Sequence, residues 1–206
     1  ETSNCHANLA GYRQIKHKNH IQVCKLHVME YLPEQEALMT SLDPAASNNG
    51  AVTAQGFRDA MARLGSAVHI VTTDGPCGWA GFAASAVCSV TDGPPTLLVC
   101  IRRDSSAYAA VTGNGVLCVN TLEAGQEPLS QLFGGKTPMN ERREAAEWAC
   151  LATGAPALGN ARITFDCRIT QCTRIGTHDV LFCTVADIAH GTQSQGGLYY
   201  AERRYW

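Results

Sequence analysis

The chain has 206 residues, of which 45% are hydrophobic and 17% charged, and its formal net charge is −2. This length and composition predict one soluble globular domain with some surplus length. The lack of a basic excess argues against nucleic-acid binding, and no apolar run approaches the roughly 20 residues that a membrane-spanning helix needs.

The first 50 residues differ in composition from the rest. They hold four of the seven histidines, at spacings that fit no metal-ligand pattern, and they end in the linker-like run Ala45-Ala46-Ser47-Asn48-Asn49-Gly50. We therefore expect residues 1–50 to be a disordered or non-native extension. We expect residues 51–206 to form the domain, without a metal site.

The ten cysteines include no C-x-x-C pair. Half of them, Cys88, Cys100, Cys118, Cys167 and Cys183, lie in apolar or alternating runs. Such positions are typical of small buried hydrophobic residues. We expect reduced, packed thiols in a cytoplasmic protein in preference to a disulfide framework.

Helical and strand patterns follow one another along the domain, with short turns between them. Phe57, Met61 and Leu64 recur at helical spacing after a good N-cap, Thr53, and predict a helix over 53–64. β-Branched residues bounded by turn chemistry predict the strands. The remaining expected helices are 107–111, 127–133 and 140–148, and the expected strands are 68–73, 79–90, 96–101 (buried on both sides), 116–120, 165–170, 180–188 and 196–200.

Many strands with short antiparallel connections and only a few helices predict a mainly β protein. The period-two alternation in 165–170 is typical of a half-buried antiparallel strand. This pattern favours a closed or nearly closed β-barrel with short helical insertions. A Rossmann domain is excluded, because strands and helices do not alternate regularly and no G-x-G-x-x-G motif occurs.

The stretch from Gly81 to Pro95 consists almost wholly of small side chains and ends in Asp92-Gly93-Pro94-Pro95. Small residues in a strand give up packing area, which indicates that something approaches the backbone closely. A neighbouring strand, a helix and a flat ligand all satisfy this pattern.

Three further stretches are candidates for binding. Arg102-Arg103-Asp104-Ser105-Ser106 precedes a predicted helix and suits an anion, with an ordinary N-cap and solvated arginines as the alternative. Gly134-Gly135-Lys136-Thr137 lacks the first glycine and the strand of a phosphate-binding loop, so a nucleotide triphosphatase is rejected, although Lys136 remains a candidate for neutralising a phosphate. His178 lies in a predicted turn and is either simply exposed or a substrate contact at the barrel rim.

No Ser-His-Asp or Cys-His arrangement can be assembled from the sequence, and few carboxylates lie in the apolar strands. We therefore predict no obligate catalytic acid or base. A small-residue strand with an anion-binding loop suits chemistry that a cofactor performs itself, such as hydride transfer.

Several segments of the chain, in the same order along the sequence, resemble the short-chain flavin reductase family. Together they span about Gln55 to Tyr205. Within that family the segments 120–130, 132–139, 165–169 and 176–183 are most similar to the NADH:FMN reductases of bacterial uracil (pyrimidine) utilisation. They are less similar to the reductase components of 4-hydroxyphenylacetate monooxygenases. The matching segments are 57–61, 68–75, 84–91, 94–100, 117–120, 176–178 and 203–205.

The resemblance implies a Greek-key, FMN-binding split β-barrel that forms a homodimer with the cofactor near the subunit interface. It implies that NADH reduces FMN and that the reduced FMN diffuses to a separate two-component monooxygenase; FAD and NADPH stay open as alternatives. Other classes also stay open: a non-enzymatic flavin-binding or redox-sensing protein, and a heme- or pyridoxal-phosphate-binding split barrel.

The resemblance also implies site residues. His178, Arg203 and Tyr205 would face the nicotinamide. The cofactor-binding residues would be Ala84, Ser85, Ala86, Val87, Cys88, Ser89, Cys100, Arg102, Ser105, Ser106, Asn120 and Lys136. Two features depart from the family: Trp206 stands where a histidine usually follows Arg203-Arg204-Tyr205, and residues 1–50 have no counterpart.

Overall fold

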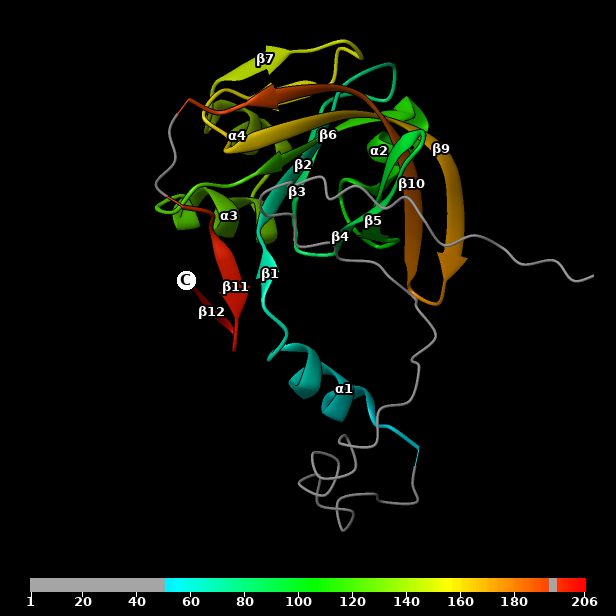
Figure 1. Cartoon of the computed structure of the whole chain (residues 1–206), viewed down its shortest axis with the longest axis vertical. Helices are drawn as coiled ribbons and strands as arrows, with labels where there is room; N and C mark the ends of the chain where they lie inside the picture. The colour runs from blue at the N-terminus through cyan, green and yellow to red at the C-terminus, as the bar shows by residue number, and fades with distance from the viewer. Residues whose placement is uncertain (1–50, 193–195) are drawn as a thin grey trace, which may run out of the picture. The chain divides into compact units, whose positions relative to one another are not determined.

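The computed structural model describes residues 51–192 and 196–206, so the expectations for residues 1–50 lie outside the described part. Seven strands form one antiparallel sheet in the order β3-β2-β6-β9-β10-β5-β4 (Figure 1). Its strands are β2 (His69–Thr73), β3 (Ala80–Ala84), β4 (Val87–Asp92), β5 (Pro95–Arg102), β6 (Val116–Thr121), β9 (Ile163–Ile175) and β10 (His178–His190).

Two small sheets and four helices complete the domain. β1 (Ser66–Ala67) pairs with β11 (Tyr199–Ala201), which pairs with β12 (Arg204–Tyr205), and β7 (Trp148–Cys150) pairs with β8 (Pro156–Leu158). The helices are α1 (Ala54–Met61), α2 (Tyr108–Asn114), α3 (Glu127–Gly134) and α4 (Met139–Glu144). No helix in the described ranges is long and apolar enough to cross a membrane.

The two edge strands of the large sheet are consecutive in the chain. β3 pairs with β2, His69 opposite Ala84, whereas β4 pairs with β5, Val87 opposite Val99. Ser85 and Ala86 carry the chain from one edge to the other, and the Cys100 amide donates to the Ala86 carbonyl at 3.0 Å. The sheet therefore curls into a barrel that is split between β3 and β5, which confirms the mainly β, split-barrel prediction, although hydrogen bonds do not close the sheet.

The core has two main parts. One lies inside the curled sheet and against α2, and includes Val71, Val99, Val111, Leu117 and Leu181. The other lies beneath α3 and includes Ile70, Leu122, Phe133, Leu158 and Leu198. Each set is apolar and almost fully buried, so each supplies the hydrophobic driving force for docking its helix on the sheet.

Aromatic rings fix α3 on β3. The rings of Trp79, Phe133 and Trp148 contact one another with centroids 5.7–6.3 Å apart. A Cβ atom on Gly81 would lie 2.6 Å from Cε1 of Phe133. The close approach predicted for the small-residue stretch is thus, at Gly81, the approach of a helix.

Several expected elements are confirmed and some boundaries differ. Thr53 caps α1, accepting from the Gly56 amide at 3.0 Å, but the helix ends at Met61. The expected strand 79–90 is two strands, because the chain changes sheet edge after Ala84. The helix expected over 140–148 ends at Glu144, since Trp148 begins β7 and joins the aromatic cluster.

The strand expected over 96–101 is confirmed, but its burial on both sides is wrong. Along β5, Leu97, Val99 and Ile101 are buried, whereas Leu98 and Cys100 are half-buried. Only one face of the strand lies in the core, and Cys100 on the other face lines a pocket.

The cysteine predictions are largely confirmed, because the eight cysteines of the described residues are all free thiols. Cys118, Cys167 and Cys183 are buried, and burial raises the pKa of each thiol, that of Cys183 to about 12. Cys88 differs, since it is exposed on the edge strand β4.

Candidate functional site

A pocket of about 660 Å³ opens where β3 and β5 separate. This volume is within the range of small-molecule sites. We call one side the β3 wall; it consists of Phe82, Ala83, Ala84, Ser85, Ala86, Phe133, Gly134, Gly135, Lys136 and Arg142. We call the other side the β5 wall; it consists of Cys100, Arg102, Asp104, Ser105, Ser106 and His178.

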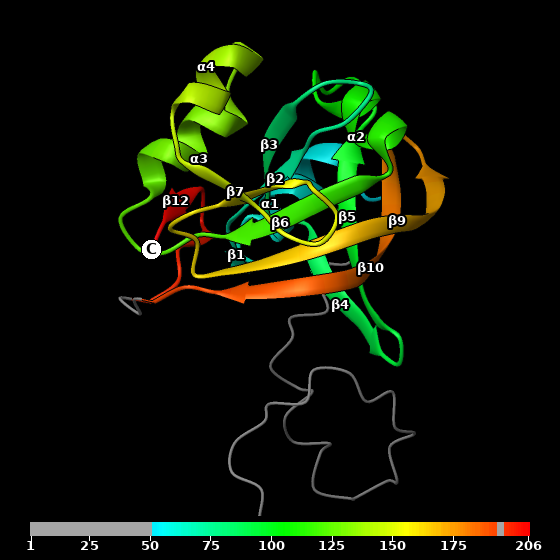
Figure 2. The same ribbon diagram turned by 90° about the horizontal axis from the view of Figure 1, so that it is seen from above.

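The two walls diverge from one point. Ala86 is hydrogen-bonded to Cys100, and from there the chain of β3 and the chain of β5 separate. In both views α3 and α4 lie on one side of β3, and β5 with α2 lies on the other (Figures 1 and 2). The pocket is therefore a consequence of the split in the barrel, and small side chains at 83–86 leave its centre open.

The charges of the β5 wall are exposed and paired with each other. Arg102 binds Asp104 through two hydrogen bonds, Nε to Oδ1 at 2.9 Å and Nη2 to Oδ2 at 2.6 Å. This hydrogen-bonded pair lowers the pKa of Asp104 and raises that of Arg102. A negatively charged ligand at this wall must compete with Asp104 for the Arg102 guanidinium.

The loop between Arg102 and α2 is held by its own main chain. The Ser105 amide donates to the Arg102 carbonyl at 3.1 Å, and the Ser105 hydroxyl accepts from the Ala107 amide at 3.3 Å. Ala107, not Asp104 or Ser105, is the N-cap of α2, so the ordinary N-cap alternative is wrong. His178 lies opposite Arg102 in the β5–β10 register and lines the same wall.

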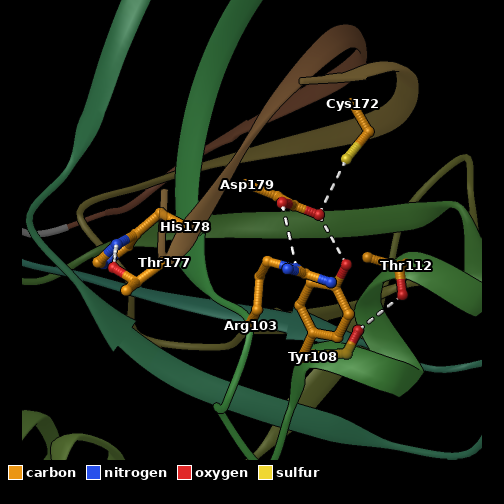
Figure 3. A network of polar contacts seen from close by, with 7 residues as sticks. All are labelled: Arg103, Tyr108, Thr112, Cys172, Thr177, His178 and Asp179. Atoms are coloured by element: carbon orange, nitrogen blue, oxygen red, sulfur yellow. Dashed lines mark hydrogen bonds and ion pairs between the residues drawn. The ribbon is translucent and has the colours of Figure 1, made fainter. Parts of the chain in front are cut away.

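A buried carboxylate lies behind the β5 wall (Figure 3). Asp179 is 5% exposed, and its Oδ2 accepts from the Tyr108 hydroxyl at 2.6 Å and from the Cys172 thiol at 3.4 Å. Its Oδ1 lies 3.7 Å from Nε of Arg103 and has no hydrogen-bond partner among the described residues. The bond from Tyr108 lowers the pKa of Asp179, and it raises the pKa of Tyr108.

Besides Cys172 of β9, this network joins three parts of the chain. Arg103 belongs to the loop of the β5 wall, Tyr108 begins α2, and Asp179 follows His178 in β10. Thr177 and His178 also contact each other, with Oγ1 and Nδ1 2.9 Å apart. These contacts tie the main chain behind the β5 wall together, and among the side chains that line the pocket His178 takes part in them.

The β3 wall contains a buried arginine. Arg142 of α4 is 3% exposed and donates three hydrogen bonds to main-chain carbonyls: to Gly81 from Nη1 at 2.7 Å, to Gly135 from Nη2 at 2.8 Å and to Thr137 from Nε at 2.9 Å. Burial lowers its pKa. Within the described part of the chain no carboxylate pairs with it.

Nine of the predicted site residues are brought together in this pocket. The remaining six are not among its lining residues. Those that line it are Ala84, Ser85, Ala86, Cys100, Arg102, Ser105, Ser106, Lys136 and His178.

Three of the six lie on β4. Val87 packs against the core of the sheet, whereas Cys88 and Ser89 are exposed on the edge strand. Because the predicted strand breaks at Ser85 and Ala86, the residues that follow leave the pocket.

Asn120 is placed in the interior of the sheet and is fully buried. Its amide donates to the Ile70 carbonyl at 2.9 Å and to the Thr72 hydroxyl at 3.0 Å. Its Oδ1 accepts from the Leu158 amide at 2.8 Å and the Thr164 hydroxyl at 2.9 Å. These four bonds use the side chain completely, so its expected place beside a cofactor is corrected to a structural one.

Tyr205 belongs to β12, and Arg203 lies in the turn that joins β11 to β12, away from His178. Arg203 pairs with Asp59 of α1, and the Tyr205 hydroxyl lies 3.1 Å from that of Ser130. In both views β12 lies at the opposite end of the domain from the β9–β10 turn (Figures 1 and 2). These two residues do not line the pocket of the described chain.

Seven pocket residues are not among the individually predicted site residues, although Phe82, Ala83 and Asp104 lie in stretches that the sequence singles out. Gly134 and Gly135 are singled out only as part of a rejected phosphate-binding loop. Arg142 gave no signal, because Asn140-Glu141-Arg142-Arg143-Glu144 is typical of a solvated helix face and its neighbour Arg143 is indeed exposed. The others are Phe82, Ala83, Asp104 and Phe133.

Comparison with known proteins places the chain among flavin reductases. A family model described as the flavin reductase like domain matches residues 61–206. The FMN reductase (NADH) RutF of Pantoea ananatis is 59% identical over 162 residues, which is 79% of this chain and 85% of that protein. The protein of the same name from Yersinia enterocolitica is 57% identical over 174 residues, which is 84% of this chain and 95% of that protein.

Solved structures agree with this. A flavin reductase candidate from Haemophilus somnus superposes with a TM-score of 0.73 at 50% identity, covering 75% of this chain and 99% of that one. The flavin reductase PheA2 superposes with a TM-score of 0.67 at 24% identity, covering 75% and 97%, and supports the fold alone.

Proposed function

The chain belongs to the flavin reductase-like family, and we propose that it is an NADH:FMN oxidoreductase that supplies reduced FMN to a separate monooxygenase. The observation that carries this proposal is the pocket at the split of the barrel. It combines an open, small-residue centre with cationic groups on both walls, in a chain 57–59% identical to FMN reductases that use NADH.

The residues present suit FMN. Ala84, Ser85 and Ala86 leave room for a flat ring close to the backbone, and the loop from Arg102 to Ser106 offers a guanidinium and hydroxyls to a phosphate. Lys136 adds an exposed cation at the same pocket. The bound pair would supply the chemistry itself: a hydride, carrying two electrons, would pass from NADH to FMN and leave NAD⁺ and anionic reduced FMN, which could exchange a proton with water.

The protein's part is to bind and orient. His178 is half-buried at the β5 wall, where it would contact the nicotinamide side. Cys100 lies at the junction of the walls, and burial raises the pKa of its thiol, which disfavours the thiolate form that a nucleophile would need. No side chain has to serve as an obligate acid or base.

A homodimer is part of the proposal. Phe57 and Met61 of α1, and Leu64 just beyond its end, are 59%, 45% and 60% exposed, and no residue of that helix is buried. A second copy covering this face would remove apolar area from water. Sedimentation of Phe57→Asp against Arg58→Asp tests this: the first variant should be monomeric and the second should not. A monomeric wild type would contradict it.

Pathway and compartment are also proposed. The resemblance to reductases of uracil utilisation supports a monooxygenase of pyrimidine degradation as the acceptor of reduced FMN. Free thiols at all eight described cysteines support a reducing, cytoplasmic setting.

The decisive test is NADH consumption with added FMN. We expect a rate that saturates with FMN and a visible spectrum that loses its flavin bands after gel filtration, as for a diffusible substrate. A rate no higher than the uncatalysed background would refute the enzyme. A protein that retains its flavin and turns over little NADH would instead be a flavin carrier or sensor.

A further inference from the structure

Arg142 stands apart from the other cations of the pocket. Arg102 and Lys136 are exposed to water, whereas Arg142 is 3% exposed. Each of its three nitrogens donates one hydrogen bond to a carbonyl, so one N–H on Nη1 and one on Nη2 have no partner among the described residues. Like Lys136 it has no carboxylate partner within that part of the chain, but unlike Lys136 it is buried, so water does not compensate its charge.

A buried charge without a counter-ion is costly, because it loses hydration that carbonyl dipoles replace only in part. The ring of Phe133 lies 6.0 Å from the guanidinium carbon and adds a weak attraction. A ligand that brings negative charge to this wall would remove the deficit. Arg142 is therefore matched to an anionic group that enters with the ligand.

The position of Arg142 selects which part of FMN this is. Its Nη1 is bonded to Gly81 of β3. Of the phosphate-binding candidates, the exposed Lys136 shares this wall, whereas the loop from Arg102 to Ser106 follows β5 on the opposite wall. A main-chain hydrogen bond joins the two walls at Ala86 and Cys100. A phosphate seated between Arg102 and Ser106 leaves the ring to face the β3 wall. Hydride transfer gives that ring a negative charge, shared by N1 and the C2 carbonyl oxygen.

We propose that Arg142 contacts the flavin ring and stabilises the negative charge that the ring acquires on reduction. This inference rests on the proposed function and names the residue that favours the reduced product. Arg142 binds the reduced ring more tightly than the oxidised ring, because a charged donor gains most from a charged acceptor. It does not discriminate between FMN and riboflavin, which share the ring and differ in the phosphate.

The test measures binding without NADH. Dissociation constants are obtained for oxidised FMN and oxidised riboflavin by fluorescence and, under anaerobic conditions, for both flavins after reduction with dithionite. Wild-type protein should bind either reduced flavin at least about tenfold more tightly than its oxidised form, as expected for a buried charge-assisted hydrogen bond. Arg142→Met should reduce that preference to less than about threefold, and Arg142→Lys should retain most of it.

Controls separate this role from a structural one. Arg143→Met removes an exposed cation next to Arg142 on α4, outside the pocket, and should leave the preference for reduced flavin unchanged. If Arg142→Met weakens oxidised and reduced binding equally, or weakens FMN but not riboflavin, the inference fails. If Arg142→Met does not fold, the wild type and Arg142→Lys decide, since equal affinities of the wild type for both forms also overturn it. Failure of NADH oxidation would refute the proposed function separately.

Discussion

On the β5 wall of the pocket Arg102 and Asp104 are exposed and neutralise each other, whereas on the β3 wall Arg142 is buried and bonded only to carbonyls. On the β5 wall an anionic ligand can replace Asp104 as the partner of Arg102 at a small cost in free energy, since water screens these charges. On the β3 wall the guanidinium of Arg142 cannot change partners in this way, because it is buried and packed against the main chain. The exposed ion pair of the β5 wall suits a phosphate that binds and dissociates. The buried guanidinium of the β3 wall suits a fixed electrostatic field around the flavin ring.

The largest effect should come from removing the buried arginine. Arg142→Met leaves three carbonyls without a donor, and we expect a loss of about 4 kcal/mol in the free energy of unfolding. Arg143→Met, one residue along α4 and exposed, should cost less than about 0.5 kcal/mol. Urea unfolding of both variants measures the difference. Equal costs would show that the β3 wall is no more rigid than the surface.

Acid should damage the β3 wall before the β5 wall. His69 pairs with Ala84 behind the β3 wall, and burial lowers its pKa from 6.5 to about 4. Below pH 6.5 the His69 side chain is therefore protonated in the unfolded chain but stays neutral in the folded chain. Stability is lost as the pH falls from 6.5 to about 4, by about 3 kcal/mol in all.

Asp104 and Asp179, at and behind the β5 wall, have lowered pKa values, so the stability they contribute is lost only as the pH falls below 3.8. The check is urea unfolding at pH 7 and at pH 4.5 for the wild type and for His69→Gln, which cannot titrate. The wild type should lose markedly more stability between the two values. Equal losses of stability in both proteins would show that protonation of His69 does not cause the acid destabilisation.

Filling the junction of the walls should weaken binding without unfolding the domain. Ala86 is exposed at the pocket, so Ala86→Leu meets no core side chain, but its added carbons occupy the space of a ring. We expect FMN affinity to fall about 30-fold. Ser89→Leu on the exposed part of β4 is the matched control and should keep normal affinity. An Ala86→Leu protein with unchanged FMN affinity would place the site elsewhere.

The sequence was sufficient for elements whose pattern is local. The strand around Val71, the strand around Val99 and the capped helix at Thr53 follow from periodicity and turn chemistry. The break at Ser85 and Ala86 did not, because it depends on which edge of the sheet each half joins. The surroundings of Asn120 and Arg142 could not be predicted, for the same reason. Neither the four hydrogen-bond partners of Asn120 nor the burial of Arg142 under the α3–α4 loop is encoded near these residues in the chain.

The smallest effect is predicted on the β5 wall, where a substitution should increase FMN affinity instead of reducing it. Asp104→Asn releases Arg102 from its paired carboxylate and removes a negative charge near the phosphate position. FMN affinity should rise about two- to fivefold, within the range of exposed ion pairs, while riboflavin affinity should not change.

Titration of both flavins at low and high salt decides the matter, because an exposed charge effect must shrink as salt is added. A gain that is equal for riboflavin, or that persists at high salt, would mean that Asp104 acts on the shape of the loop and not on its charge. In that case the contrast between an exchangeable β5 wall and a fixed β3 wall would not hold, since both walls would act through packing.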